Sequence, residues 1–154
     1  VEMNQLRERR YQEGLAKGYS FGRFVHPSVT IHDGVSIEEN AIVLDYASIH
    51  PGCRIGRGAF ISSNVNIGHD CDVGEYSWIN SGVALGGGCR IGSGCFFGVN
   101  SSTVQDVQLG QRNFIAANTV INRNTKDDEV YLSASAERFR LNSQAFLKFS
   151  RMAE

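Results

Sequence analysis

Residues 66–91 read NIGHDCDVGEYSWINSGVALGGGCRI, and a large apolar residue returns at every sixth position. The row runs from residue 25 to residue 121, and 16 of its 17 members are large and apolar. A helix has a period of 3.6 residues and a strand a period of 2, so neither explains the row. Short strands joined by turns, each stacked on an earlier strand, do explain it. The members are Val25, Ile31, Ile37, Val43, Ile49, Ile55, Ile61, Ile67, Val73, Ile79, Leu85, Ile91, Phe97, Thr103, Leu109, Ile115 and Ile121.

Two further columns repeat with the same period. Four residues after each row member the side chains are mostly small or slender, and this column holds all four cysteines, Cys53, Cys71, Cys89 and Cys95. We therefore expect the cysteines to pack in a core rather than to bind metal or form disulfides. Three residues after each row member, 13 of 17 residues are Gly, Asn or Asp. These types tolerate a positive φ, so this turn column predicts a left-handed residue at each corner. Its exceptions are Ser28, Tyr46, Tyr76 and Arg112.

The chain has 154 residues and a formal net charge of -1, which predicts one domain and gives no reason to expect nucleic acid or a membrane as a partner. It has no apolar run long enough to span a membrane, and its start is too polar for a secretory signal, so we expect a cytoplasmic protein.

We divide the chain into a helical lead (residues 1–24), a coil of repeats (25–126) and a tail (127–154). A short helix is predicted over residues 3–17. A second, amphipathic helix would carry Phe139, Leu141, Ala145, Phe146, Phe149 and Met152.

This pattern is the hexapeptide repeat, and it resembles the left-handed parallel β-helix of hexapeptide acyltransferases. In that family three hexads make one triangular coil, so residues 18 apart stack. The resemblance implies an all-β fold, a left-handed parallel β-helix with short helices at both ends. At about 4.8 Å between strands, residues 25–126 would form roughly five to six coils.

Stacking at 18 residues sorts the corners into three sets. One carries Asp33, Pro51, His69, Gly87, Gln105 and Arg123; a second carries Pro27, Asp45, Ser63, Ser81, Val99 and Ala117; a third carries Glu39, Arg57, Glu75, Ser93 and Gln111. His69 is the only histidine in these positions, and Gly87 above it has no side chain. The imidazole is therefore expected to face open space and an accessible backbone N–H. Asp70 lies in the turn column, where Asp is expected anyway, and consecutive residues in extended chain point apart, which argues against a simple pair.

Four aromatic residues, Phe60, Trp78, Phe96 and Phe114, are spaced by 18 and each precedes a row member, so they should point outward. Soluble monomers rarely leave such an apolar stripe bare. Either the C-terminal helix or another subunit is expected to cover it. A homotrimer is favoured because the prisms of the family assemble as closed threefold rings. The second corner of a neighbour would then lie against the His69 corner and leave a slot for a thin ligand.

Two stretches carry a narrower resemblance: IGHDCDVG (residues 67–74) and INSGVALGGGCRIGSGCFFGVNSSTV (residues 79–104). They look like the sugar acyltransferases related to sialic-acid O-acetyltransferases and bacillosamine-type N-acetyltransferases. The resemblance implies that His69 is the general base and that Asp70 raises its basicity. It also implies that the backbone N–H of Gly87 stabilises the oxyanion.

The same resemblance implies an acyl donor and an acceptor. Acetyl-CoA would donate the acetyl group, with Val99 and Ala117 contacting its pantetheine, and an amino or hydroxyl group of a sugar would accept it directly. Trp78 stands where relatives can carry a histidine near the thioester. The Gly-x-Pro-Ala stretch that follows the last coil in the family is replaced by SASA at residues 133–136. No metal is expected.

Two other functions remain open. The γ-type carbonic anhydrases use the same prism with histidine ligands at trimer interfaces, and His32 and His50 stack because they are 18 apart. However, the H-x4-H spacing of that family is absent, since the residues five away from His69 are Asn64 and Gly74. The prism could also be a non-catalytic scaffold that only assembles subunits.

Overall fold

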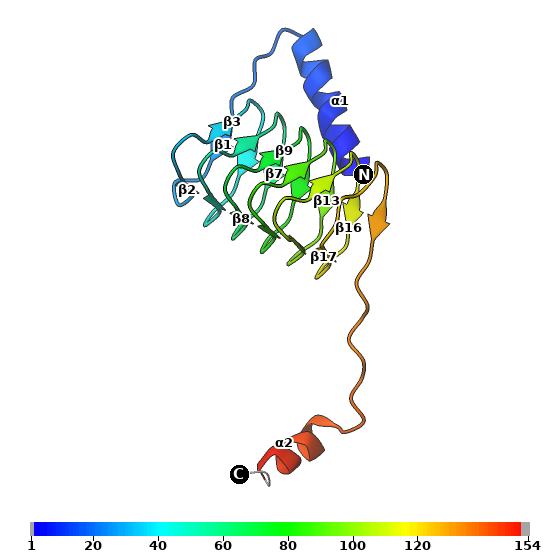
Figure 1. Ribbon diagram of the computed structural model, residues 1–154. Helices are drawn as coiled ribbons and strands as arrows, with labels where there is room; N and C mark the ends of the chain where they lie inside the picture. The colour runs from blue at the N-terminus through cyan, green and yellow to red at the C-terminus, as the bar shows by residue number, and fades with distance from the viewer. Residues whose placement is uncertain (1, 152–154) are drawn as a thin grey trace.

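The computed structural model describes residues 2–151 and shows a three-sided parallel β-helix with a helix near each end (Figure 1). The fold predicted from the six-residue row is confirmed. Sheet A contains β1 (Phe24–Val25), β4 (Ile42–Val43), β7 (Phe60–Ile61), β10 (Trp78–Ile79), β13 (Phe96–Phe97), β16 (Phe114–Ile115) and β18 (Val130–Tyr131). Sheet B contains β2 (Thr30–Ile31), β5 (Ser48–Ile49), β8 (Asn66–Ile67), β11 (Ala84–Leu85), β14 (Ser102–Thr103) and β17 (Val120–Ile121). Sheet C contains β3 (Ser36–Ile37), β6 (Arg54–Ile55), β9 (Asp72–Val73), β12 (Arg90–Ile91) and β15 (Gln108–Leu109).

The register between neighbouring strands follows the predicted step of 18 residues. In sheet A, for example, Phe60 pairs with Trp78 and Trp78 pairs with Phe96. The last coil is shorter than the others, as the pairing of Phe114 with Val130 shows.

Corners between the sheets are named by the sheets they join: the A–B corner carries residues 45, 63, 81, 99 and 117, and the B–C corner carries residues 33, 51, 69, 87 and 105. The C–A corner carries residues 39, 57, 75, 93 and 111.

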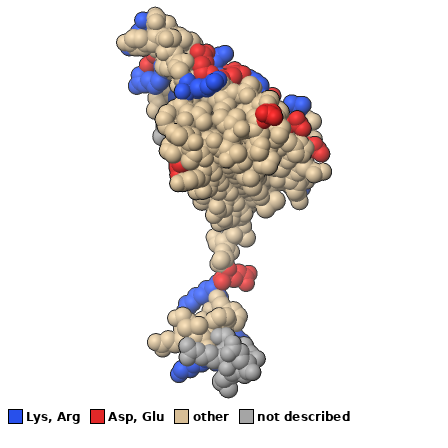
Figure 2. Space-filling model, turned by 90° about the vertical axis from the view of Figure 1, so that its left-hand side faces the viewer, with Lys and Arg blue, Asp and Glu red and all other residues tan. Residues whose placement is uncertain are grey.

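The six-residue row forms the core. Its members from residue 37 onward are buried, and many, such as Ile49, Ile67 and Phe97, are fully enclosed. Ile31 is 47% exposed because it belongs to the first coil, which has no earlier coil against it. Figure 2 views the prism from this end, where few charged side chains lie on the coil.

The turn column adopts the predicted left-handed conformation throughout the coil. Every sixth residue from 34 to 118 has a φ between 55° and 75°. This set includes Tyr46, Tyr76 and Arg112, whose side chains disfavour that conformation. The repeating backbone therefore fixes φ at these corners even where the residue type does not favour it.

Helix α1 (Glu2–Ala16) agrees with the helix predicted over residues 3–17 and lies along the coils (Figure 1). The Asn4 side chain donates to the carbonyls of Gly94 and Cys95, both at 3.0 Å. Nearer the other end of the helix, the Tyr11 hydroxyl donates to Glu39 at 2.6 Å. The chain in α1 therefore runs from the last coils back toward the first.

Helix α2 (Ser143–Arg151) stands apart from the coils at the end of an extended segment (Figure 1). Of the apolar residues assigned to this helix, Phe139 and Leu141 precede it, and the rings of Phe139 and Phe146 meet edge to face at 5.8 Å. Met152 and the side chain of Phe149 lie outside the described residues. Within residues 2–151 no helix has the length and apolar character needed to cross a bilayer.

The aromatic stripe on sheet A forms as two stacked pairs. The ring centroids of Phe60 and Trp78 are 4.3 Å apart, and those of Phe96 and Phe114 are 5.0 Å apart. The Arg7 guanidinium of α1 lies 5.8 Å from the centroids of both Phe60 and Trp78. The N-terminal helix, and not α2, therefore contacts this stripe, and all four aromatic rings are half-buried.

Candidate active site

The corner that carries His69 is held by the coils on both sides of it. Strand β8 ends at Ile67, β9 begins at Asp72, and the chain turns between them from sheet B to sheet C. The Asp70 N–H donates to the Pro51 carbonyl of the previous coil at 2.8 Å. The Gly88 N–H of the next coil donates to the His69 carbonyl, also at 2.8 Å. The backbone under the imidazole is thus fixed from both sides.

His69 and Asp70 form a hydrogen-bonded pair, with His69 Nδ1 2.9 Å from Asp70 Oδ2. The expectation that these neighbours point apart is wrong. Asp70 has a φ of 56°, so its side chain does not follow the alternation of extended chain. Because a carboxylate only accepts hydrogen bonds, Nδ1 carries the proton and the neutral ring offers Nε2 as the basic nitrogen.

The surroundings of His69 make the imidazole more basic. The hydrogen bond that His69 donates to Asp70 is the largest influence and raises the pKa of His69, burial opposes it, and the charges of Asp70 and Asp106 add to the rise. The side chains of His69 and Asp70 are 68% and 72% exposed in the single chain. Asp106 was not singled out from the sequence. Asp106 occupies the same turn column as Asp70, two coils later. An acidic residue 36 positions after Asp70 is the feature of the sequence that indicates a second negative charge near His69.

Gly87 lies directly against the basic nitrogen. A Cβ at this position would be 2.5 Å from His69 Nε2, so the ring occupies the space that a side chain would fill. The Gly87 carbonyl accepts from the Asp106 N–H at 2.8 Å. Its own N–H makes no hydrogen bond within residues 2–151, and the same holds for the corner N–H groups of Ser81 and Ser93. What distinguishes Gly87 is the imidazole beside its free donor.

The residues predicted to bind the acyl donor lie elsewhere on the chain. Val99 is 47% exposed at the A–B corner, and Ala117 follows it one coil later. The Ser133 hydroxyl of the SASA stretch donates to the Ala117 carbonyl at 2.8 Å. Trp78 lies on sheet A, where its Nε1 donates to Asn80 at 3.2 Å. Within one chain, sheet B separates Val99 and Ala117 from the His69 corner.

The cysteines are buried and free, as expected from their column. Burial raises the pKa of the Cys95 thiol to about 11, which makes it a poor nucleophile. His32 and His50 do stack, with ring centroids 5.1 Å apart. In the described part of the chain no group of three or more His, Cys, Asp or Glu side chains is arranged to hold a metal ion.

Comparison with known proteins adds a family and a set of structural neighbours. The family model described as the GMPPB C-terminal domain matches residues 23–131. A sequence search of curated proteins gives no match. Among solved structures, the acetyltransferase domain of PglB from Neisseria gonorrhoeae in complex with acetyl coenzyme A superposes with a TM-score of 0.83 and 22% identity. That alignment covers 90% of this chain and 68% of the other.

Two further structures are similar. Another structure of the PglB acetyltransferase domain has a TM-score of 0.78 and 23% identity, over 81% of this chain and 61% of that one. A mutant GDP-perosamine N-acetyl transferase from Caulobacter crescentus, in complex with CoA and GDP-perosamine, has a TM-score of 0.65 and 24% identity, over 90% of this chain and 67% of that one. The chain thus spans between 61% and 68% of the length of these three structures, and the likeness establishes a shared fold.

Proposed function

Since the chain belongs to the GMPPB C-terminal domain family, we propose that it transfers an acetyl group from acetyl-CoA to an amino or hydroxyl group of a nucleotide-linked or sialic-type sugar. The observation that carries this proposal is the His69 imidazole, which is bonded to Asp70 through Nδ1 and lies against Gly87 through Nε2. A base and a free backbone donor at one corner are what acyl transfer requires. The acetyltransferases of the same fold, crystallised with acetyl-CoA or CoA, support the choice of donor.

The reaction is a direct transfer without a covalent enzyme intermediate. The sugar nitrogen or oxygen attacks the thioester carbonyl carbon while His69 Nε2 takes the proton of the attacking group. The carbonyl oxygen becomes an oxyanion, for which the Gly87 N–H is the candidate donor. The C–S bond then breaks, and the proton held by His69 passes to the CoA sulfur. Asp70 keeps Nδ1 protonated and stabilises the imidazolium that forms in between.

The proposed assembly is a homotrimer in which one subunit completes the site of the next. Val99 and Ala117 lie at a corner that cannot reach His69 within the same chain, because sheet B lies between them. A second copy that places its A–B corner against the B–C corner would bring small side chains and free corner N–H groups to the imidazole. Such a slot fits the thin, amide-containing pantetheine arm. Trp78, on the strand that leads into the A–B corner, would approach the same slot from the second copy.

The test is titration of the purified chain with acetyl-CoA by calorimetry, followed by an acetyl-transfer assay over a panel of amino and nucleotide sugars. We expect a trimer in solution that binds acetyl-CoA with micromolar affinity. Gly87→Trp should abolish this binding, because its side chain must displace the His69 ring. The matched control is Gln111→Trp, an exposed position at the C–A corner that should bind as the parent does. A correctly folded trimer that neither binds acetyl-CoA nor transfers acetyl would overturn the proposal.

A further inference from the structure

The carboxylate of Asp70 occupies a space that exists only because the preceding coil has a glycine beneath it. A Cβ on Gly52 would come closer than 3.0 Å to Asp70 Oδ1 and to 3.4 Å from Asp70 Cγ. Distances under 3.0 Å are essentially never seen for a real Cβ, so a side chain at residue 52 forces the carboxylate to move. The atom that would be struck belongs to the group that holds His69.

The Asp70 backbone cannot yield to such a clash. Its N–H is bonded to the Pro51 carbonyl at 2.8 Å, and its φ of 56° is imposed by the repeat. The side chain must therefore rotate. One carboxylate oxygen faces Gly52 while the other accepts from His69 Nδ1, so rotation away from Gly52 also displaces Oδ2 from the imidazole.

We propose that Gly52 is a positioning residue that keeps the Asp70 carboxylate on His69. This inference rests on the proposed function in one respect: His69 is taken to be the base whose pKa Asp70 raises. The same spatial arrangement recurs along the coil, since Asp106 Oδ1 lies over Gly88 and Asn100 Oδ1 lies over Gly82. A side chain lying over a glycine of the previous coil is therefore a general feature of the repeat. At Gly52 the side chain concerned is Asp70, which is hydrogen-bonded to a histidine.

The chain contains a matched control one coil earlier. Gly34 occupies the same turn column with a φ of 72°, against 75° for Gly52, so an alanine meets the same backbone strain at both positions. A Cβ on Gly34 would approach only the backbone of Gly52, at 3.6 and 3.8 Å, which is ordinary contact. A difference between Gly34→Ala and Gly52→Ala therefore reports on Asp70 and not on the positive φ.

The experiment is an NMR titration of the His69 imidazole in the complete chain for the parent, Gly52→Ala, Gly34→Ala and Asp70→Asn. We expect Gly52→Ala to lower the pKa of His69, as Asp70→Asn should, because the hydrogen bond that His69 donates to Asp70 is what raises that pKa most. Gly34→Ala should titrate as the parent. In the Asp70→Asn background, Gly52→Ala should lower the pKa no further.

Two additions keep the test decisive. Where Gly52→Ala does not fold, Gly52→Asn takes its place with Gly34→Asn as control, since Asn tolerates a positive φ but still carries a Cβ. A folded Gly52 variant with the His69 pKa of the parent would overturn the proposal. In the transfer assay the variant should lose about tenfold in kcat/KM, the effect of one charge-assisted hydrogen bond at an exposed site. Because the titration does not depend on turnover, it stands even if His69→Ala retains activity and the proposed function fails.

Discussion

Asp70 and Tyr76 occupy the same position of the repeat at successive corners, and they serve opposite purposes. Their φ angles are 56° and 55°, and each side chain lies over a glycine one coil earlier, Gly52 and Gly58 respectively. The Asp70 side chain is 72% exposed and bonded to His69. Tyr76 is 5% exposed and lies under α1, with its ring centroid 6.2 Å from that of Tyr11. The backbone fixes the direction of each side chain, and what lies opposite decides its role.

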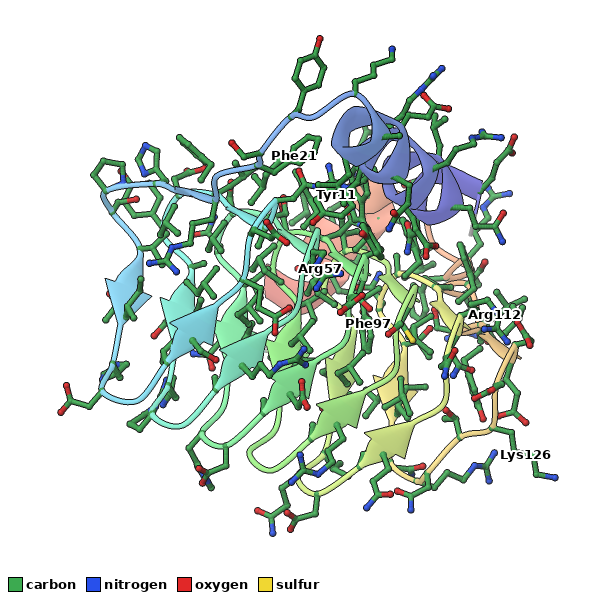
Figure 3. All side chains as sticks on the ribbon, turned by 90° about the horizontal axis from the view of Figure 1, so that it is seen from above. Tyr11, Phe21, Arg57, Phe97, Arg112 and Lys126 are labelled. Carbon is green, nitrogen blue, oxygen red and sulfur yellow. The ribbon has the colours of Figure 1, made fainter. Side chains whose placement is uncertain are left out.

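The C–A corner is built for attachment of the N-terminal helix. Arg7 donates to the Gly58 carbonyl at 3.1 Å, and the Arg57 guanidinium lies 5.8 Å from the Tyr11 ring centroid. Figure 3 shows Tyr11 of α1 close to Phe21 and Arg57 at the side of the helix, and the rings of Tyr11 and Phe21 are 4.7 Å apart. Burial raises the pKa of Tyr76 to about 12, so this phenol stays neutral. Within residues 2–151 no helix covers His69 and Asp70 at the B–C corner in this way.

The largest effect is expected from a change at the exposed B–C corner, where His69 lies. His69→Ala should reduce turnover by about 10²- to 10⁴-fold, the usual contribution of a positioned general base. The melting temperature and the proposed trimer should be unchanged, because the His69 side chain is 68% exposed. His26→Ala is the control, since the His26 side chain is bonded to its own turn through Ser28 Oγ at 2.8 Å. Steady-state kinetics beside light scattering would measure both properties, and full activity in His69→Ala would remove the base assignment.

The next largest effect is expected from a change at the C–A corner, which α1 covers. Tyr76→Ala should lower the free energy of unfolding by about 3 kcal/mol, the low end of the range for removing a buried aromatic side chain. Turnover should change little, because Tyr76 lies at a different corner from His69. Tyr46→Ala is the matched control, with a φ of 57° in the same column but 67% exposure. Urea denaturation measures the difference, and equal midpoints for the two variants would show that Tyr76 does not anchor α1.

The sequence predicted the coil well because a periodic backbone is encoded by periodic residues. The row, the cysteine column and the turn column needed no long-range information, since each coil repeats the contacts of the last. The attachment of α1 could not be predicted in this way. Its contacts are hydrogen bonds from single side chains such as Asn4 and Arg7 to carbonyls of distant coils, and no period in a polar helix reveals them.

The candidate site divides along the same line. The stacking of Gly87 on His69 followed from the step of 18 residues and is confirmed. Alternation along extended chain argues against the His69–Asp70 hydrogen bond, whereas the turn column implies a positive φ at Asp70 and the family resemblance implies that Asp70 assists His69. The roles of Val99, Ala117 and Trp78 stay predictions, because they depend on the contacts between copies that we propose for the trimer.

A third and smaller effect is expected from replacing the exposed acid, Asp70. In the parent, kcat/KM should rise with pH as His69 loses its proton, and the midpoint should lie above the ordinary pKa of a histidine because the hydrogen bond that His69 donates to Asp70 raises its pKa. Asp70→Asn removes that influence, so the acid limb should move to lower pH while the plateau falls by about tenfold. A pH series of initial rates measures both changes. An acid limb that stays in place would mean that another group controls it.

The smallest effect comes from the one exposed tyrosine in the turn column. Tyr46 has a φ of 57° and is 67% exposed, so its ring gains little from burial while its backbone is held in an unfavourable conformation. Tyr46→Asn should therefore raise the free energy of unfolding by about 0.5 kcal/mol, because Asn tolerates this conformation. Tyr76→Asn should lower it, since the same gain is outweighed by the lost contact with α1. Thermal denaturation at several protein concentrations measures both. If Tyr46→Asn instead destabilises the protein in a concentration-dependent way, another copy covers the A–B corner at Tyr46 as well as at Val99 and Ala117, which lie three and four coils later and which the proposed trimer buries.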